Sequence, residues 1–204
     1  MTHLIPTHDK PLRSIIILGP PGSGKGTIGK TLALAGNHYH LSSGDIFRGL
    51  SPVSPAGQLF STYASKGHLL PDDVTIAIWR NYVAGLISTN RYFPDEQLLL
   101  LDGVPRTLQQ AKIIDSYIEV NHIVVLEMAD IEGLVQRMKK RALIEGRSDD
   151  THENVLRTRM EVYEKQTKEI LSHYSSDLVT KFNADQSRLE VLRDILMKLC
   201  TLDA

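Results

Sequence analysis

The sequence predicts an α/β fold built on a five-stranded parallel sheet with helices on both faces. Its apolar runs, such as residues 14–18 and 97–101, are continuous rather than alternating, as in strands that are buried on both sides. Segments with helix-forming signals separate these runs, which favours right-handed crossovers between parallel strands. The length of 204 residues, with 42% hydrophobic residues, is enough for one domain with a buried core.

Five apolar segments account for the sheet. Most are rich in Ile, Val and Leu, and each is bounded by polar residues, glycine or proline. Short runs of this kind are typical of strands. In chain order, strands are predicted at residues 14–18, 38–41, 97–101, 122–126 and 178–183.

Helices are predicted between the strands, mainly from their capping residues. Ser54 followed by Pro55 is an N-cap and first-turn pair, and Thr107 with Gln110 has the spacing of a capping box. Gly36 marks the end of one helix, and Asp130 marks the start of another. The predicted helices cover 24–35, a short stretch from Ser43, 56–66, 72–88, a segment after Thr107, 130 to about 141, 151–173 and 187–199.

A glycine-rich loop with one lysine follows the first predicted strand. Its pattern is Gly19-x-x-x-x-Gly24-Lys25, which is the pattern of a phosphate-binding P-loop. Backbone N–H groups in such a loop surround an anion, and the next helix contributes its N-terminal dipole. The usual Ser or Thr after the lysine is replaced by Gly26, and Thr27 comes one residue later. The fold class is therefore a three-layer P-loop fold.

Two further polar motifs follow predicted strands, at 43–48 and 102–106. In an open parallel sheet, ligands bind at the carboxyl ends of the strands, so these motifs are expected beside the P-loop. Guanidinium groups bind phosphate bidentately and stay charged, which suits a reaction between two nucleotides. Asp102, directly after a buried strand, is a candidate to orient hydrated Mg²⁺. The candidate cations are Lys25, Arg48, Arg106, Arg137, Arg141, Arg147 and Arg159.

Charge and cysteine content exclude several classes of function. The net charge of −1 gives no electrostatic basis for binding nucleic acid or a membrane surface. The single cysteine, Cys200, permits no intrachain disulfide and no cysteine zinc site. Residues 1–13 resemble neither a secretory signal nor a membrane span, and we expect an N-terminal extension there. A cytoplasmic location is the resulting expectation.

Four ordered motifs together resemble the adenylate kinase family of nucleoside monophosphate kinases. They lie at residues 19–27, 41–48, 101–107 and 146–150. The resemblance implies reversible, Mg²⁺-dependent phosphoryl transfer from ATP to AMP, which gives two ADP and serves adenine nucleotide homeostasis. It implies ATP, AMP and ADP as small-molecule partners and a monomer, and the net charge indicates no nucleic acid and no membrane.

The resemblance also implies roles for individual residues. The ATP-binding set is Gly22, Ser23, Gly24, Lys25, Gly26, Thr27, Arg137, Arg141 and Gln186. The AMP-binding set is Ser43, Arg48, His68, Leu69, Leu70, Gly103, Val104, Pro105, Arg106, Gln110, Arg147 and Arg159. The residues that would act on the transferred phosphoryl group are Lys25, Arg106, Arg141, Arg147 and Arg159, and Asp102 would hold Mg²⁺ through water.

In domain terms, the resemblance implies a single P-loop kinase domain at 14–204, with an NMP-binding insertion at 43–72. It implies a short lid loop at 142–150, without the zinc-binding cysteines of longer lids, so no structural zinc is expected. The chain departs from the family at Val104, where Phe is usual, and at Gln186, where short-lid members often have Gly. One extra residue after Arg147 leaves a choice between Arg157 and Arg159, and the spacing to Tyr163 favours Arg159.

Two other functions remain open on the sequence. A UMP/CMP kinase is one, although Ser43, Thr107 and Gln110 together favour AMP as the acceptor. The other is a nucleotide-binding module without transfer activity. Retention of Lys25, Arg48, Arg106 and Arg147 disfavours that module, because a degenerate kinase is expected to lose at least one of them.

Overall fold

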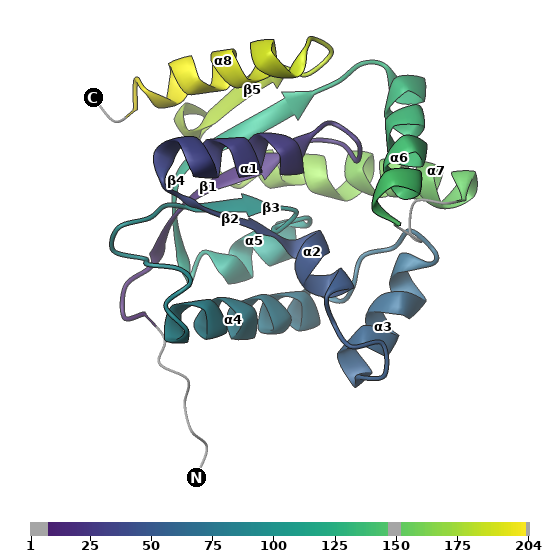
Figure 1. Ribbon diagram of the computed structural model, residues 1–204, viewed down its shortest axis with the longest axis horizontal. Helices are drawn as coiled ribbons and strands as arrows, with labels where there is room; N and C mark the ends of the chain where they lie inside the picture. Colours follow the sequence, from purple (N-terminus) through teal and green to yellow (C-terminus); the bar gives the residue numbers. More distant parts are fainter. Residues whose placement is uncertain (1–7, 147–151, 203–204) are drawn as a thin grey trace.

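The computed structural model describes residues 8–146 and 152–202, and its centre is a five-stranded sheet. All strand pairs are parallel, in the order β2-β3-β1-β4-β5 (Figure 1). This confirms the predicted fold class. The strands are β1 (Leu12–Leu18), β2 (Tyr39–Ser42), β3 (Leu99–Asp102), β4 (Ile118–Glu127) and β5 (Val179–Asn183).

Eight α-helices connect and cover the strands in the described ranges. Their ends follow the local chemistry: the side chains of Ser54, Thr107 and Asp130 each accept a hydrogen bond from the backbone N–H three residues on. Ser187 and Glu190 form a complete capping box. The helices are α1 (Lys25–Gly36), α2 (Ser43–Arg48), α3 (Pro55–Ala64), α4 (Asp72–Ser88), α5 (Leu108–Ile114), α6 (Ile131–Glu145), α7 (Glu153–Val162) and α8 (Arg188–Leu199).

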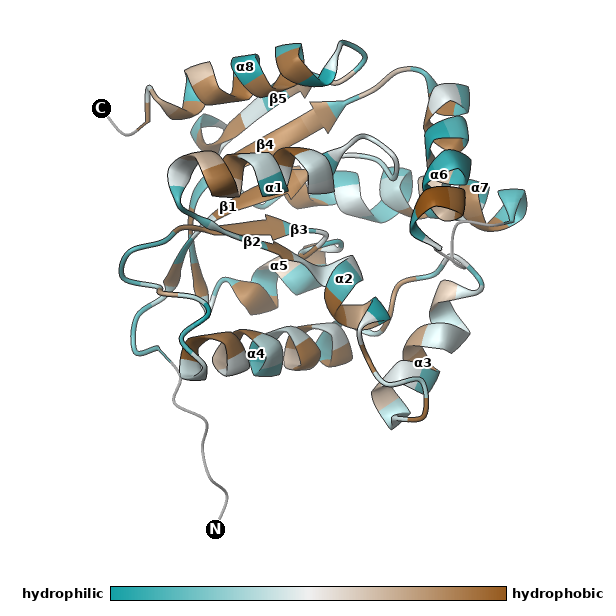
Figure 2. Cartoon of the chain, in the orientation of Figure 1, coloured by the Kyte–Doolittle hydropathy of each residue, from teal (hydrophilic) through white to brown (hydrophobic). Residues whose placement is uncertain are grey.

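The sheet has an apolar core on each face. Along β1, Ile16 packs against α4 and α5, whereas Ile15 and Ile17 pack against α1 and α8. This alternation follows from the two-residue period of a strand. Figure 2 shows the same arrangement as hydrophobic colour along the central strands and more hydrophilic colour on the outer surfaces of the helices.

The strand register brings three of the predicted motifs to one edge of the sheet. Asp102 at the end of β3 is aligned with Ile17 on one side and with Ser42 on the other. The loops that follow β1, β2 and β3 therefore leave the sheet at the same level. This is the edge at which parallel sheets bind their ligands.

Several element boundaries differ from the prediction. β4 begins at Ile118, whereas its predicted strand begins at 122. β1 begins at Leu12, inside the segment 1–13 that was predicted to be an extension. α6 continues to Glu145, so residues 142–145 are helix rather than loop, and Gly146 ends the helix in the left-handed conformation at φ 63°. The residues Ala142, Leu143 and Glu145 are good helix formers, which accounts for the extension. The rest of the predicted lid loop, including Arg147, lies outside the described residues.

The predicted helix at 151–173 is not continuous. After α7 the chain forms a π-helical turn, η2 (Tyr163–Thr167), and then a 3₁₀ helix, η3 (Lys168–Ser172). A second short 3₁₀ helix, η4 (Ser176–Leu178), precedes β5. The Thr167 hydroxyl donates a hydrogen bond of 3.0 Å to the carbonyl oxygen of Arg106, and this tertiary contact lies where the regular helix ends.

Among the described residues, no helix combines the length and the apolar character that crossing a membrane requires.

Replacing Ile16 by Ala is expected to lower the free energy of unfolding by about 2 to 5 kcal/mol, because it opens a cavity in the central strand. Ile16 is 0% exposed. Urea unfolding followed by circular dichroism measures the change. Leu34→Ala is the control, because Leu34 is 86% exposed and its truncation should change stability by less than about 0.5 kcal/mol. Equal losses in the two variants would contradict this description of the core.

Candidate functional site

A cavity of about 820 Å³ opens at the carboxyl ends of the strands. The loops after β1, β2 and β3 line it, together with parts of α6, α7 and the loop before α8. Most of the predicted site residues lie on its wall: Gly22, Ser23, Gly24, Lys25, Gly26, Thr27, Arg48, His68, Leu69, Leu70, Asp102, Gly103, Pro105, Arg106, Gln110, Arg137, Arg141, Arg159 and Gln186.

The loop between β1 and α1 curls tightly at the base of the cavity. Gly22 and Gly24 adopt φ angles of 87° and 95°, which side chains other than glycine rarely tolerate. A Cβ on Gly22 would also stand 2.9 Å from the Leu134 carbonyl oxygen, so α6 packs directly against the loop. The Lys25 ammonium donates hydrogen bonds of 2.8 and 2.9 Å to the carbonyl oxygens of Gly19 and Pro20. The backbone conformation of the loop thus holds the Lys25 ammonium beside the carbonyl oxygens of residues 19 and 20.

The Lys25 ammonium stands in an unfavourable electrostatic environment. The pKa of Lys25 is lowered to about 8: burial is the largest cause, Asp102 acts in the opposite direction, and the charges of Arg106, Arg141 and Arg159 add to the lowering. Removal from water and like-charge repulsion both disfavour the charged form of a lysine. An anion that entered the cavity would relieve both costs.

Asp102 is the anionic group of this cluster. Burial alone would raise its pKa, but the His40 imidazole, whose Nε2 lies 3.8 Å from Asp102 Oδ2, and the charges of Lys25 and Arg106 hold the pKa below its ordinary value. A Cβ on Gly26 would lie 3.4 Å from its Oδ2 atom, so the carboxylate faces the position where a P-loop usually has Ser or Thr. The side chain therefore stays ionised beside the loop.

The donor set at Asp102 fits a magnesium ion. No group of three or more His, Cys, Asp or Glu side chains among residues 8–146 and 152–202 could hold a metal. A single buried carboxylate beside a phosphate-binding loop suits Mg²⁺, which keeps several waters and binds phosphate oxygens. Soft-ligand metals would require a different set of side chains.

The ends of β2 and β3 are joined through the carbonyl oxygen of Gly103. It accepts hydrogen bonds of 2.7 Å from the Ser43 hydroxyl and of 2.7 Å from Arg106 Nε. Ser43 and Val104 are 2% exposed and do not line the cavity. Ser43 therefore holds the Gly103 loop in place from behind, and Val104 is a core residue beside it.

Arg48 reaches the cavity from α2. Its guanidinium donates a hydrogen bond of 2.6 Å to the Asp45 carboxylate, one helical turn earlier. Its side chain is 24% exposed. The arginine thus lines the same cavity as the P-loop.

Gln110 departs from the predicted capping box. Its backbone N–H donates to the Thr107 hydroxyl as expected, but its side chain does not bond back to Thr107. Instead, Oε1 accepts from the Arg106 backbone N–H and Nε2 donates to Asp72 on α4. The side chain is therefore part of a network between elements rather than a local cap.

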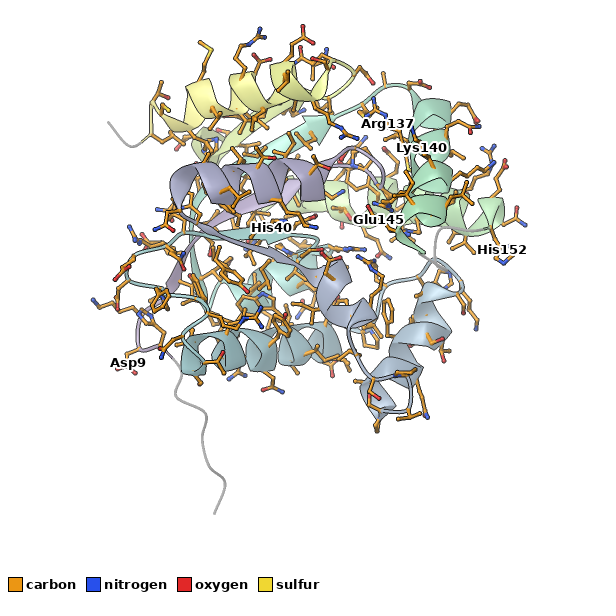
Figure 3. All side chains as sticks on the ribbon, in the orientation of Figure 1. Asp9, His40, Arg137, Lys140, Glu145 and His152 are labelled. Carbon is orange, nitrogen blue, oxygen red and sulfur yellow. The ribbon has the colours of Figure 1, made fainter. Side chains whose placement is uncertain are left out.

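Three arginines from α6 and α7 complete the wall: Arg137, Arg141 and Arg159. Figure 3 labels Arg137 and Lys140 on α6, the helix beside the N-terminal end of α1. Arg157 does not line the cavity; it pairs with Glu132 and Glu153 and is 50% exposed.

The cavity wall also contains residues that the sequence did not indicate. Lys140 lies one turn from Arg137, and Tyr163 and Thr167 come from the π-helical turn. Lys140 could have been predicted from its spacing, because residues three apart on a helix share one face and Arg137 was already a candidate. Asp72 and His40 act through contacts between elements, and no local pattern indicates them.

The family model and curated proteins of similar sequence all indicate the same family. The family model for adenylate kinase matches residues 17–179. The adenylate kinase of Flavobacterium psychrophilum is 38% identical over 177 residues, which is 84% of this chain and 88% of that protein. Those of Corynebacterium diphtheriae and Thermus thermophilus are each 35% identical, over 81% and 83% of this chain and 88% and 87% of their own lengths.

Replacing Lys25 by Met is expected to change the pH dependence of stability. The pKa of Lys25 is about 8 in the folded chain against an ordinary 10.5, so between these values the unfolded chain binds more protons. Wild-type stability should therefore gain from rising pH across this window, and that gain should be missing in the variant. Urea unfolding from pH 7 to 10 measures the difference.

The control for this prediction is Lys30→Met, which removes an exposed lysine from the same helix. The free-energy difference between Lys25→Met and wild type should favour the variant most at pH 7 and shrink as the pH rises. A difference that is constant across the range would contradict the half-buried, charge-crowded environment of Lys25.

Proposed function

The chain belongs to the adenylate kinase family, and from this premise we propose how its residues divide the work of the reaction. The enzyme transfers a phosphoryl group between ATP and AMP, giving two ADP. One observation carries the proposal: four cations, Lys25, Arg106, Arg141 and Arg159, line one cavity together with the ionised carboxylate of Asp102. Such a cluster matches the negative charge of two nucleotides in contact.

The ATP phosphates are proposed to bind in the loop at residues 22–27, with Lys25 as the main charge. The curled glycine backbone and the ammonium at its mouth support this placement. Arg137 and Gln186 are proposed to border the ATP adenine, since both line the cavity at the α6 and α8 end. Gln186 is oriented there by a hydrogen bond of 2.7 Å to Asp194.

Members of this family use Mg-ATP, and Asp102 is proposed to hold the ion through water. When bound, Mg²⁺ neutralises charge on the phosphate oxygens and helps to align them. The lowered pKa of Asp102 supports the role, because the carboxylate then stays ionised at neutral pH. Gly26 supports it too, since the missing side chain leaves space beside Oδ2.

AMP is proposed to bind on the side of α2, between Arg48 and Arg106. Both guanidinium groups line the cavity there and can bind its phosphate. Residues 68–70 and the loop at 103–105 would enclose the base and ribose, and Gln110 would contact the adenine. Ser43 and Val104 are proposed to shape this wall from behind, because neither side chain reaches the cavity.

The transferred phosphoryl group is proposed to pass between the two sites among Lys25, Arg106, Arg141 and Arg159. These groups would align donor and acceptor and stabilise the charge that develops in transfer. Arg159 is chosen over Arg157 because Arg157 is paired with surface glutamates. The role of Arg147 stays a prediction, as do the insertion at 43–72, the lid loop at 142–150, the monomeric state, the cytoplasmic location and the absence of zinc.

A coupled assay with ATP and each of AMP, UMP, CMP and GMP tests the acceptor. Turnover should be fast with AMP and at least about a hundredfold lower in kcat/KM with the others, because the base-contacting groups would be left unpaired. Preference for UMP or CMP would show that the acceptor site is a pyrimidine site. No transfer with any acceptor would overturn the assignment of the cavity.

Arg48→Ala and Arg137→Ala should separate the two nucleotide sites. We expect Arg48→Ala to raise KM for AMP by about ten- to a hundredfold with little change for ATP, since it removes a charged hydrogen bond to phosphate. Arg137→Ala should act mainly on ATP. Steady-state kinetics with each substrate varied in turn gives the values. Arg157→Ala is the matched control, and equal effects on both substrates in either test variant would refute the division.

A further inference from the structure

The side-chain amide of Gln110 is held from both ends. Its Nε2 donates a hydrogen bond of 2.9 Å to Asp72 Oδ1, and its Oε1 accepts one of 2.8 Å from the Arg106 backbone N–H. The residue is 1% exposed, yet it belongs to the wall of the cavity. The amide is thus a buried group with two fixed partners and one side toward the ligand space.

The two partners determine which way round the amide lies. A carboxylate oxygen only accepts, and a backbone N–H only donates. Turning the amide over would set its carbonyl oxygen against the Asp72 carboxylate and its NH₂ against the Arg106 N–H, losing two hydrogen bonds and creating two repulsive contacts. The hydrogen-bond partners therefore determine which amide atom is the oxygen and which is the nitrogen.

Asp72 is itself fixed in place. The Thr107 hydroxyl donates a second hydrogen bond of 2.9 Å to its Oδ1, and the same hydroxyl accepts from the Gln110 backbone N–H. Asp72 stands in the first turn of α4, where the helix dipole stabilises a negative charge. Asp72, Thr107 and Gln110 therefore form a closed ring that joins the end of the 43–72 segment to the start of α5.

After these contacts the amide has one N–H and one carbonyl lone pair left for a ligand. A 6-aminopurine offers the complementary pair, a donor at N6 and an acceptor at N1. A 6-oxopurine offers the reverse, an acceptor at O6 and a donor at N1. An amide that could turn over would accept both bases, whereas one that is fixed can match only one of them.

We propose that Asp72 is a specificity-determining positioning residue, which holds the Gln110 amide in the orientation that accepts a 6-aminopurine and rejects a 6-oxopurine. The inference rests on the proposed function in one respect, namely that Gln110 meets the base of the acceptor nucleotide. Asp72 touches neither substrate nor phosphate in this scheme. It acts only through the amide.

The test compares AMP with inosine monophosphate, which differs from AMP only in the 6-oxo group and the proton on N1. In Asp72→Ala, the ratio of kcat/KM for AMP over inosine monophosphate should fall at least about tenfold, the effect of losing one charged hydrogen bond. The ratio in Asp72→Asn should lie between those of the wild type and Asp72→Ala, because the Asn amide oxygen still accepts a hydrogen bond but carries no charge. Titration calorimetry of both monophosphates should give the same order without turnover.

Asp73→Ala is the matched control, because Asp73 shares the first turn of α4 but is exposed and bonds to nothing in the ring. Its ratio should stay at the wild-type value, which separates discrimination from the general effect of a helix-end charge. Thermal unfolding of each variant checks that the fold is retained. If Asp72→Ala does not fold, Asp72→Asn carries the comparison.

Gln110→Ala separates failure of this inference from failure of the proposed site. If Gln110→Ala leaves the AMP preference unchanged, Gln110 does not meet the base and the placement of the acceptor is wrong. If Gln110→Ala removes the preference while Asp72→Ala and Asp72→Asn keep it at the wild-type value, the site stands and the role of Asp72 is overturned. A lower ratio of kcat/KM for AMP over inosine monophosphate in both Gln110→Ala and the Asp72 variants supports the inference.

Discussion

The rest of the site depends on positive charge held at one edge of the sheet. Lys25 is held there by hydrogen bonds to two backbone carbonyl oxygens. Its lowered pKa reflects the unfavourable free energy of a charged ammonium in this environment. The Asp102 carboxylate raises the Lys25 pKa and so offsets part of this cost. Clustered positive charge lowers the stability of the folded chain and favours anion binding. A bound phosphate would offset this loss of stability.

Residues from distant parts of the chain meet at this edge because backbone groups tie them together. The Gly103 carbonyl oxygen receives both Ser43 and Arg106, and the Arg106 carbonyl oxygen receives Thr167. The bonds from Ser43 and Thr167 each join the loop after β3 to an element from elsewhere in the sequence, whereas the bond from Arg106 lies within that loop. Lys25 and Arg106 are thus positioned in part by backbone carbonyl oxygens, which carry no net charge.

Much of this could be predicted from the sequence because the signals are local. Continuous apolar runs, capping residues and the loop at 19–27 each depend on a few adjacent residues. The length of α6 was underestimated although Gly146 was an available stop signal, because residues 142–150 were interpreted as a polar loop. The break after α7 and the role of Asp72 could not be found, since they depend on bonds between segments more than thirty residues apart.

The bond between Thr167 and Arg106 has a mechanical consequence for the C-terminal third of the chain. It fastens the segment after α7 to the loop that carries the proposed AMP-side arginine. Arg159 lies on the near side of this anchor, before the π-helical turn, and β5 lies beyond it. A displacement of α7 relative to this anchor would therefore be taken up within residues 163–167, the turn that separates α7 from Thr167.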